Sequence, residues 1–307
     1  MKILRPKLDI IFKSIFGNDN NAEIITELIS VILNIPKSTI KEITIMNVEI
    51  PNEEYEQKFG RLDLRIKVNK NDKIEIISIE IQVLTDKDYR ERTLWYWSKN
   101  FSTQLKTGEP YSNLPKVICI NIINFNLFKC KDYRSKFLLT EEKRKELLTD
   151  KIEIYFLELR KFRKYLKKKR KKNTDPITAL EKWLAFIDIE KEGDLMELEK
   201  TLSKDDETLN KAIVILKTLS GDEKTRELAF LKEQRLHDEA SAIKNAEDIG
   251  ISKGIKRGIK QGKNEERASL NLLNSILLKN KRYDDLERST TDKEFQQQLI
   301  NELLPKS

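Results

Sequence analysis

Histidine and cysteine are scarce in this sequence of 307 residues, which contains one histidine, His237, and two cysteines, Cys119 and Cys130. A Ser-His-Asp or Cys-His catalytic site, an HExxH zinc site and a Cys/His zinc finger each need more of these residues. The sequence also has no GxxxxGK[ST] and no GxGxxG motif, which excludes phosphate-binding loops of these two kinds. If the protein is an enzyme, we expect its chemistry to depend on carboxylate, Lys, Arg, Tyr or Gln side chains.

Long hydrophobic runs are missing as well. No window of the sequence approaches the roughly 18 apolar residues that a membrane-spanning helix needs. Residues 1–16 carry scattered Lys, Arg and Asp, so they do not have the pattern of a signal peptide. Two cysteines without a disulfide framework fit a reducing compartment. We therefore predict a cytoplasmic protein with no membrane partner.

The first half of the chain alternates between helix and strand patterns, whereas the second half is helical. Helical spacing of apolar residues predicts one or two short helices near the N-terminus and a long helix over residues 86–107. Interleaved helices and strands are typical of a mixed α/β domain, which we expect over residues 1–160. A basic linker at 161–174, a helical region at 175–245 and a helical tail at 246–307 would follow. The expected strands are residues 43–50, 59–68, 74–83, 116–123 and 151–159.

The net charge of +8 comes from one short segment. The run RKFRKYLKKKRKK, residues 160–172, holds 10 basic residues and no acidic one, and the other 49 basic residues are outnumbered by 51 acidic residues. Such a run attracts a phosphate backbone through release of counterions, so Lys167, Lys168, Lys169 and Arg170 are candidate phosphate-binding residues. The alternatives are a solvated surface segment and another anionic partner.

A glycine recurs every four residues in the tail, at Gly250, Gly254, Gly258 and Gly262. Each glycine inside a helix costs about 1 kcal/mol relative to alanine, so the row needs a reason. Close approach of a second helix is one reason, and it predicts a homo-oligomer formed through this tail. A flexible basic arm, or a repeat that tolerates weak helicity, would explain the row equally well.

Two neighbouring strands carry polar side chains inside an otherwise apolar pattern. With the two-residue period of a strand, Asp63 lies on the face opposite to the apolar residues of the first strand, and Glu80 and Gln82 do so on the second. If the strands pair as an antiparallel hairpin, these side chains converge. Two carboxylates could bind a divalent metal ion. The alternative is an ion pair between Glu80 and Arg61 or Arg65 on a half-exposed face.

These residues resemble the PD-(D/E)XK nucleases, in which an Asp on one strand is followed by E-x-K on the next. Here Gln82 stands in the Lys position, and this E-x-Q form is similar to the recombination-promoting nuclease (Rpn-like) and transposase branch. Three further stretches support the resemblance. They are LDIIFKSIFG, KFGRLDLRI and the helix, turn and strand that begin with RERTLWYW.

The resemblance implies a restriction-endonuclease-like mixed sheet and a DNA endonuclease that uses Mg²⁺ or Mn²⁺, associated with recombination or mobile elements. Asp63 and Glu80 would bind the metal, and Gln82 would orient the attacking water or the phosphate. Asp9 in the opening motif would complete the acidic cluster, with Glu23 and Glu27 as rivals.

The helix that follows the E-x-Q strand offers two further candidates. Arg92 and Tyr96 lie one helical turn apart, so they share a face and could both reach a phosphate oxygen. Ordinary packing would explain the pair as well. Gln82 cannot transfer a proton as a lysine can, so a second hypothesis for the function of the protein stays open. In this second hypothesis, the protein has the same fold but binds nucleic acid or self-associates and has little catalytic activity.

Overall fold

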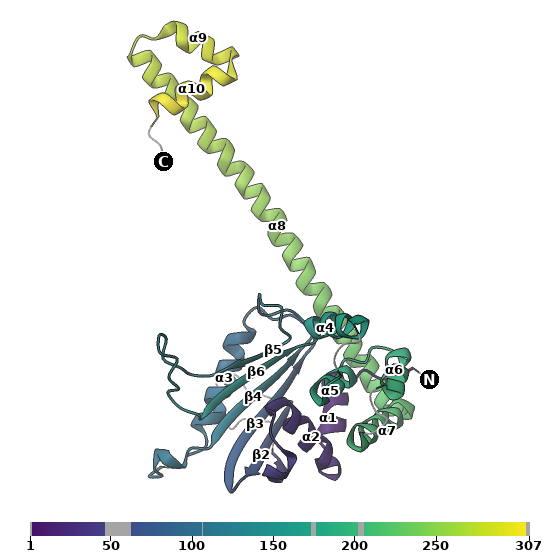
Figure 1. The fold of residues 1–307 in the computed structure, drawn as a ribbon. Coiled ribbons are helices and arrows are strands. Elements are labelled where there is room, and N and C mark those ends of the chain that lie inside the picture. Colours follow the sequence, from purple (N-terminus) through teal and green to yellow (C-terminus); the bar gives the residue numbers. More distant parts are fainter. Residues whose placement is uncertain (1, 47–62, 106, 173–175, 202–205, 305–307) are drawn as a thin grey trace. The chain divides into compact units, whose positions relative to one another are not determined.

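A computed structural model gives the fold of the chain and describes residues 2–46, 63–105, 107–172, 176–201 and 206–304. The chain divides into two compact units, residues 1–236 and 237–307. The first unit contains a six-stranded sheet with helices on both faces, and the second is helical (Figure 1). This arrangement confirms the prediction of a mixed α/β core followed by a helical C-terminal region.

The sheet has the strand order β1-β2-β3-β4-β6-β5. Strands β3, β4 and β6 run parallel to one another, whereas β1, β2 and β5 are each antiparallel to their neighbours. A parallel pair needs a crossover connection, and helix α3 makes it between β3 and β4. The strands are β1 (Ile40–Ile45), β2 (Leu64–Lys70), β3 (Lys73–Gln82), β4 (Lys116–Ile123), β5 (Arg134–Phe137) and β6 (Ile152–Glu158).

A two-residue turn joins β2 to β3. Asn71 and Asp72 both have positive φ, 49° and 62°, which matches a turn whose twist suits an antiparallel hairpin. The turn sets the register in which Leu64 lies opposite Ile79. One face of the hairpin therefore carries Leu64, Ile66, Ile77 and Ile79, as the two-residue period predicts, and the charged Glu75 lies on it opposite Val68, near the turn.

Helices α1, α2 and α4 pack on the apolar face of the sheet, and α5 and α7 pack on these helices. The buried side chains of all five form one continuous core with the sheet. Helix α3 packs on the opposite face, where a smaller apolar cluster includes Tyr89, Ile123 and Phe156. The helices of this unit are α1 (Asp9–Phe16), α2 (Ala22–Leu33), α3 (Tyr89–Ser102), α4 (Leu159–Lys172), α5 (Ala179–Ile187), α6 (Glu192–Thr201) and α7 (Glu207–Gly221). Short 3₁₀ turns lie at Asp19–Asn21, Lys37–Thr39 and Tyr111–Asn113.

The second unit contains most of helix α8 (Glu223–Lys279), together with α9 (Tyr283–Thr291) and α10 (Lys293–Leu303). Leu273, Leu277 and Leu299 form a small core where α8 and α10 meet. The glycine row lies within α8, and a Cβ added at any of its four positions would meet no atom within 4 Å. Among the described helices, none is both long enough and apolar enough to cross a membrane.

The sequence predicted most of the elements but not all of their limits. Strand β4 has the predicted bounds, whereas β5 was missed because it is only four residues long and three of them are polar. Parts of two predicted strands, residues 47–50 and 59–62, lie outside the described residues. The basic run forms helix α4. The predicted boundary at 161–174 falls inside the first compact unit, so the division of residues 1–236 into two domains stays a prediction.

Candidate active site

Asp63 and Glu80 meet where β2 begins and β3 approaches its end. The main-chain N–H of Asp63 donates to Glu80 Oε1 at 3.1 Å. In the other direction, Asp63 Oδ2 accepts from the main-chain N–H of Ile81 at 2.8 Å. The two carboxylates therefore lie side by side, on the hairpin face that the sequence pattern assigned to them.

The surroundings of Glu80 disfavour its charge. Burial, and next the neighbouring charge of Asp63, raise the pKa of its carboxyl from an ordinary 4.5 to about 8. The hydrogen bond from Asp63 N–H and the charges of Arg92 and Lys13 act in the opposite direction. Within the described residues Glu80 forms no ion pair with Arg65, and Arg61 lies outside them. Burial and the adjacent charge of Asp63 outweigh the opposing effects, and a bound cation would offset both.

The Gln82 amide is held by the protein at both of its polar atoms. Its Oε1 accepts from Arg92 Nη2 at 3.1 Å, and its Nε2 donates to the carbonyl of Leu84 at 3.2 Å. Arg92 also forms an ion pair with Asp86 at 3.0 Å, and its guanidinium lies 4.6 Å from the centroid of the Tyr89 ring. Arg92 is therefore a partner of Gln82 and Asp86, and its contact with phosphate stays a prediction.

Tyr96 faces the same acidic group from helix α3. Burial raises the pKa of its hydroxyl, and the charge of Glu80 is the next cause. The centroid of its ring also lies 5.3 Å from that of the Trp95 ring. Tyr96 therefore packs against a neighbouring aromatic ring and is also close enough to the acids to feel their charge. Its predicted contact with phosphate stays a prediction.

A buried polar network that the sequence reasoning missed lies beside Glu80. Asn121 on β4 is the register partner of Glu80, and its Oδ1 accepts from Tyr89 Oη and Thr93 Oγ1, both at 3.2 Å. Its amide Nδ2 donates to the carbonyl of Tyr155 at 3.0 Å. The only available signal was one Asn in an otherwise apolar strand. These contacts fix helix α3, which carries Arg92 and Tyr96, against the sheet.

Lys13 is a second residue that the sequence reasoning missed. It lies on α1, and its Nζ is 3.0 Å from Asp63 Oδ1. The available signal was its place in the opening motif, one turn after Asp9.

The contacts of Asp9 point elsewhere. Its Oδ2 pairs with Lys232 at 2.9 Å, and its Oδ1 accepts from the N–H of Ile10. The rival Glu23 pairs with Lys211 and Glu27 with Lys37. None of these contacts joins the three acids to Asp63 or Glu80, and the role of Asp9 stays a prediction.

The four basic candidates of helix α4 fall into two pairs. Lys169 pairs with Glu181 at 2.8 Å and its side chain is 9% exposed, while Arg170 pairs with Glu197. Lys167 and Lys168 are exposed, and the described residues show no acidic partner for either. These two lysines are thus the ones available to an anion.

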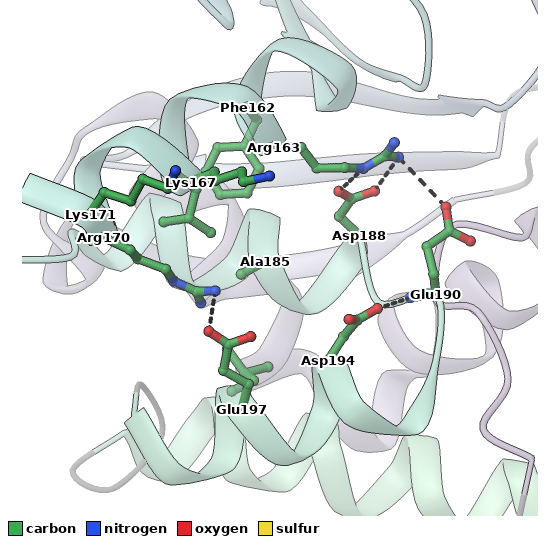
Figure 2. A pocket seen from close by; sticks show the side chains of 12 residues that line it. Phe162, Arg163, Lys167, Arg170, Lys171, Ala185, Asp188, Glu190, Asp194 and Glu197 are labelled. Carbon is green, nitrogen blue, oxygen red and sulfur yellow. Dashed lines mark hydrogen bonds and ion pairs between the residues drawn. The ribbon is translucent and has the colours of Figure 1, made fainter.

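Helix α4 also forms one wall of a cavity of about 570 Å³ (Figure 2). The acidic residues of the opposite wall are already paired, because Asp188 accepts from Arg163 and Lys7, and Glu197 from Arg170. Arg163 also donates to Asn124 Oδ1 at 2.6 Å, and the N–H of Asn124 donates to the carbonyl of Gln82 at 2.8 Å. Hydrogen bonds through Asn124 therefore link the wall of the cavity to the end of strand β3. The residues that line the cavity are Phe162, Arg163, Leu166, Lys167, Arg170, Lys171, Ala185, Asp188, Glu190, Asp194, Glu197 and Leu198.

Two adjacent carboxylates suit a hard divalent cation, which prefers oxygen ligands. The raised pKa of Glu80 is consistent with such a site, since a bound cation would compensate the charge that burial disfavours. The described residues contain no cluster of three or more Asp, Glu, His or Cys that could hold a metal ion. Asp63 and Glu80 are therefore the two carboxylates that would hold such a cation, and water and phosphate oxygens would have to supply its other ligands.

Comparison with known proteins gives one match. The family model described as PD-(D/E)XK nuclease family transposase matches residues 6–246. No curated protein and no solved structure matches the chain. The matched region includes the whole sheet, both acids and helix α3. This chain belongs to the PD-(D/E)XK nuclease family transposases.

Proposed function

We propose that the protein is a metal-dependent endonuclease that hydrolyses phosphodiester bonds of DNA, using Mg²⁺ or Mn²⁺. The observation that carries this proposal is the hydrogen bond from the main-chain N–H of Asp63 to the Glu80 carboxylate, with the two acids close enough to interact electrostatically. Family membership supports the same reaction class, because PD-(D/E)XK nucleases cut phosphodiesters. Helix α4 supports a DNA partner through the exposed Lys167 and Lys168.

In this reaction a water oxygen forms a new bond to phosphorus, the bond to the leaving sugar oxygen breaks, and a proton passes to that oxygen. Asp63 and Glu80 would hold the cation, which when bound polarises the water and offsets negative charge on the phosphate. Arg92 holds Gln82 in place and, with Tyr96, bounds the side of the site formed by helix α3. Because Gln82 cannot act as a base, we expect slow cleavage.

Nicking of supercoiled plasmid by the purified protein, with Mg²⁺ or with EDTA, tests the proposal. Asp63→Asn and Glu80→Gln should each remove at least 99% of the Mg²⁺-dependent activity, on the order of the loss expected when charge stabilisation is removed. Glu75→Gln is the matched control, because Glu75 lies on the same strand but at its opposite end. Cleavage by the two site variants at the parent's rate would refute the assignment.

The second candidate is a DNA-binding protein of the same family with little or no cleavage activity. It is favoured by the Gln82 amide, both polar ends of which are occupied by protein groups. This candidate predicts DNA binding without Mg²⁺-dependent nicking. Binding should weaken with salt, and Lys167→Gln with Lys168→Gln should reduce the slope of log affinity against log salt by about 2. An unchanged slope would exclude these lysines from the interface.

Self-association through the tail is proposed as a separate property. The four glycines face open space, and Ile251, Ile255 and Ile259 beside them are each more than half exposed. A close helix–helix contact would use both rows. Gly254→Leu with Gly258→Leu should then reduce the oligomer measured by light scattering, whereas an unchanged mass would remove this explanation for the glycines.

A further inference from the structure

One positively charged side chain at the site, that of Lys13, has no role in the proposed function so far. Lys13 reaches Asp63 from helix α1, which packs on the other side of the sheet from helix α3. Its Nζ lies 3.0 Å from Asp63 Oδ1, and its side chain is 32% exposed. The charge of Lys13 also extends to Glu80, where it lowers the pKa. The lysine is thus in contact with one acid and electrostatically coupled to the other.

The E-x-Q strand brings no positive charge of its own to the site. A neutral amide at position 82 contributes no charge where negative charge gathers on a phosphate during hydrolysis. Arg92 is the other described cation close to the acids, and it is held by Gln82 and Asp86. Lys13 has one partner, Asp63, in the part of the chain that the structure describes, and a metal ion would compete for that partner.

We propose that Lys13 supplies the positive charge that Gln82 lacks. Without a divalent cation, Lys13 neutralises Asp63; when a cation binds Asp63, the freed ammonium contacts a non-bridging oxygen of the scissile phosphate. This second step rests on the proposed nuclease function. Lys13 would then be a phosphate-binding residue of the reaction, contributed by the first helix of the chain.

The two roles predict effects of opposite sign for one substitution. Lys13→Met removes a positive charge that competes with the metal ion, so the affinity for Mn²⁺ should rise, by roughly fivefold for a partly exposed charge at this range. Cleavage should fall by at least tenfold, because a charge on the phosphate is lost. A residue that only supported the fold would lower both quantities. Lys13→Arg keeps the charge and should leave the Mn²⁺ affinity within about twofold of the parent.

The chain offers a closely matched control. Lys232 pairs with Asp9 on the same helix at 2.9 Å, and its side chain is 33% exposed. Lys232→Met therefore removes an equivalent lysine–aspartate pair away from the two acids, and it should change neither Mn²⁺ affinity nor cleavage. In a fourth variant, Lys13→Met combined with Gln82→Lys, an ammonium returns on the E-x-Q strand, and cleavage should recover at least in part.

The experiment measures Mn²⁺ affinity of full-length protein without DNA, by titration calorimetry, and nicking of supercoiled plasmid. Tighter Mn²⁺ binding with slower nicking in Lys13→Met, and parent behaviour in Lys232→Met, would support the proposal. Parent-like nicking by Lys13→Met would overturn it while leaving the nuclease function intact. If the parent itself does not nick DNA, the nuclease function and the phosphate role fail together. If the Mn²⁺ affinity of Lys13→Met also equals that of the parent, Lys13 does not compete with the metal ion for Asp63.

Discussion

Replacing Glu80 with glutamine should change how the stability of the protein depends on pH. The pKa of this carboxyl is raised from 4.5 to about 8, chiefly by burial and then by the charge of Asp63. Between these two values the folded protein holds a proton that the unfolded chain releases. The free energy of unfolding therefore falls as the pH rises through this window.

The size of the effect follows from the width of the window. Each pH unit removes about 1.4 kcal/mol, so the full window removes on the order of 5 kcal/mol at most, and partial exposure of the side chain reduces that figure. The contribution of Glu80 is fully present below pH 4.5 and is lost once the pH exceeds about 8. Glu80→Gln has no proton to lose, so without metal it should be less sensitive to pH and more stable than the parent at pH 8.5.

Urea denaturation at pH 5.0 and at pH 8.5, with EDTA or with Mg²⁺, checks this prediction. Mg²⁺ should stabilise the parent at pH 8.5 according to its occupancy, and it should stabilise Glu80→Gln much less. Glu75→Gln, on the same strand, should follow the parent in every condition. If the parent and Glu80→Gln lose stability equally between the two pH values, the reasoning about the buried acid is wrong.

Three further substitutions test other parts of the site. Asn121→Leu removes the shared partner of Tyr89 and Thr93 and should lower the free energy of unfolding by about 2 kcal/mol, measured by urea denaturation; parent-like stability would contradict the role of this network. Lys169→Met removes the positive charge that pairs with the buried Glu181, so it should destabilise the protein. Its DNA affinity in a filter-binding assay should stay within twofold of the parent. Unchanged stability with weaker DNA binding would place Lys169 in the DNA interface. Asp9→Asn breaks a half-exposed pair with Lys232 and should cost less than about 1 kcal/mol with plasmid nicking retained; loss of nicking would return Asp9 to the active site.

The hairpin and its two acids could be predicted because each depends on local sequence alone. The two-residue period placed Asp63 and Glu80 on one face, and the turn at residues 71 and 72 set their register. Lys13 could not be predicted in this way, since its contact with Asp63 joins residues 50 positions apart through the packing of helix α1. The same limit applies to Lys169. The local sequence shows only a basic run around it, whereas its partner Glu181 comes from a different helix.

The short connection between β2 and β3 therefore has a consequence for how this gene can vary. Register in a hairpin is fixed by the length of its turn, and a slip of one residue moves every side chain to the other face. If one codon inserted between Asn71 and Asp72 shifted the pairing by one residue, Arg65 and Lys67 would turn toward the apolar interior and Asp63 would move away from Glu80. Length changes in this turn that shift the register are expected to disrupt the fold and the acidic pair together.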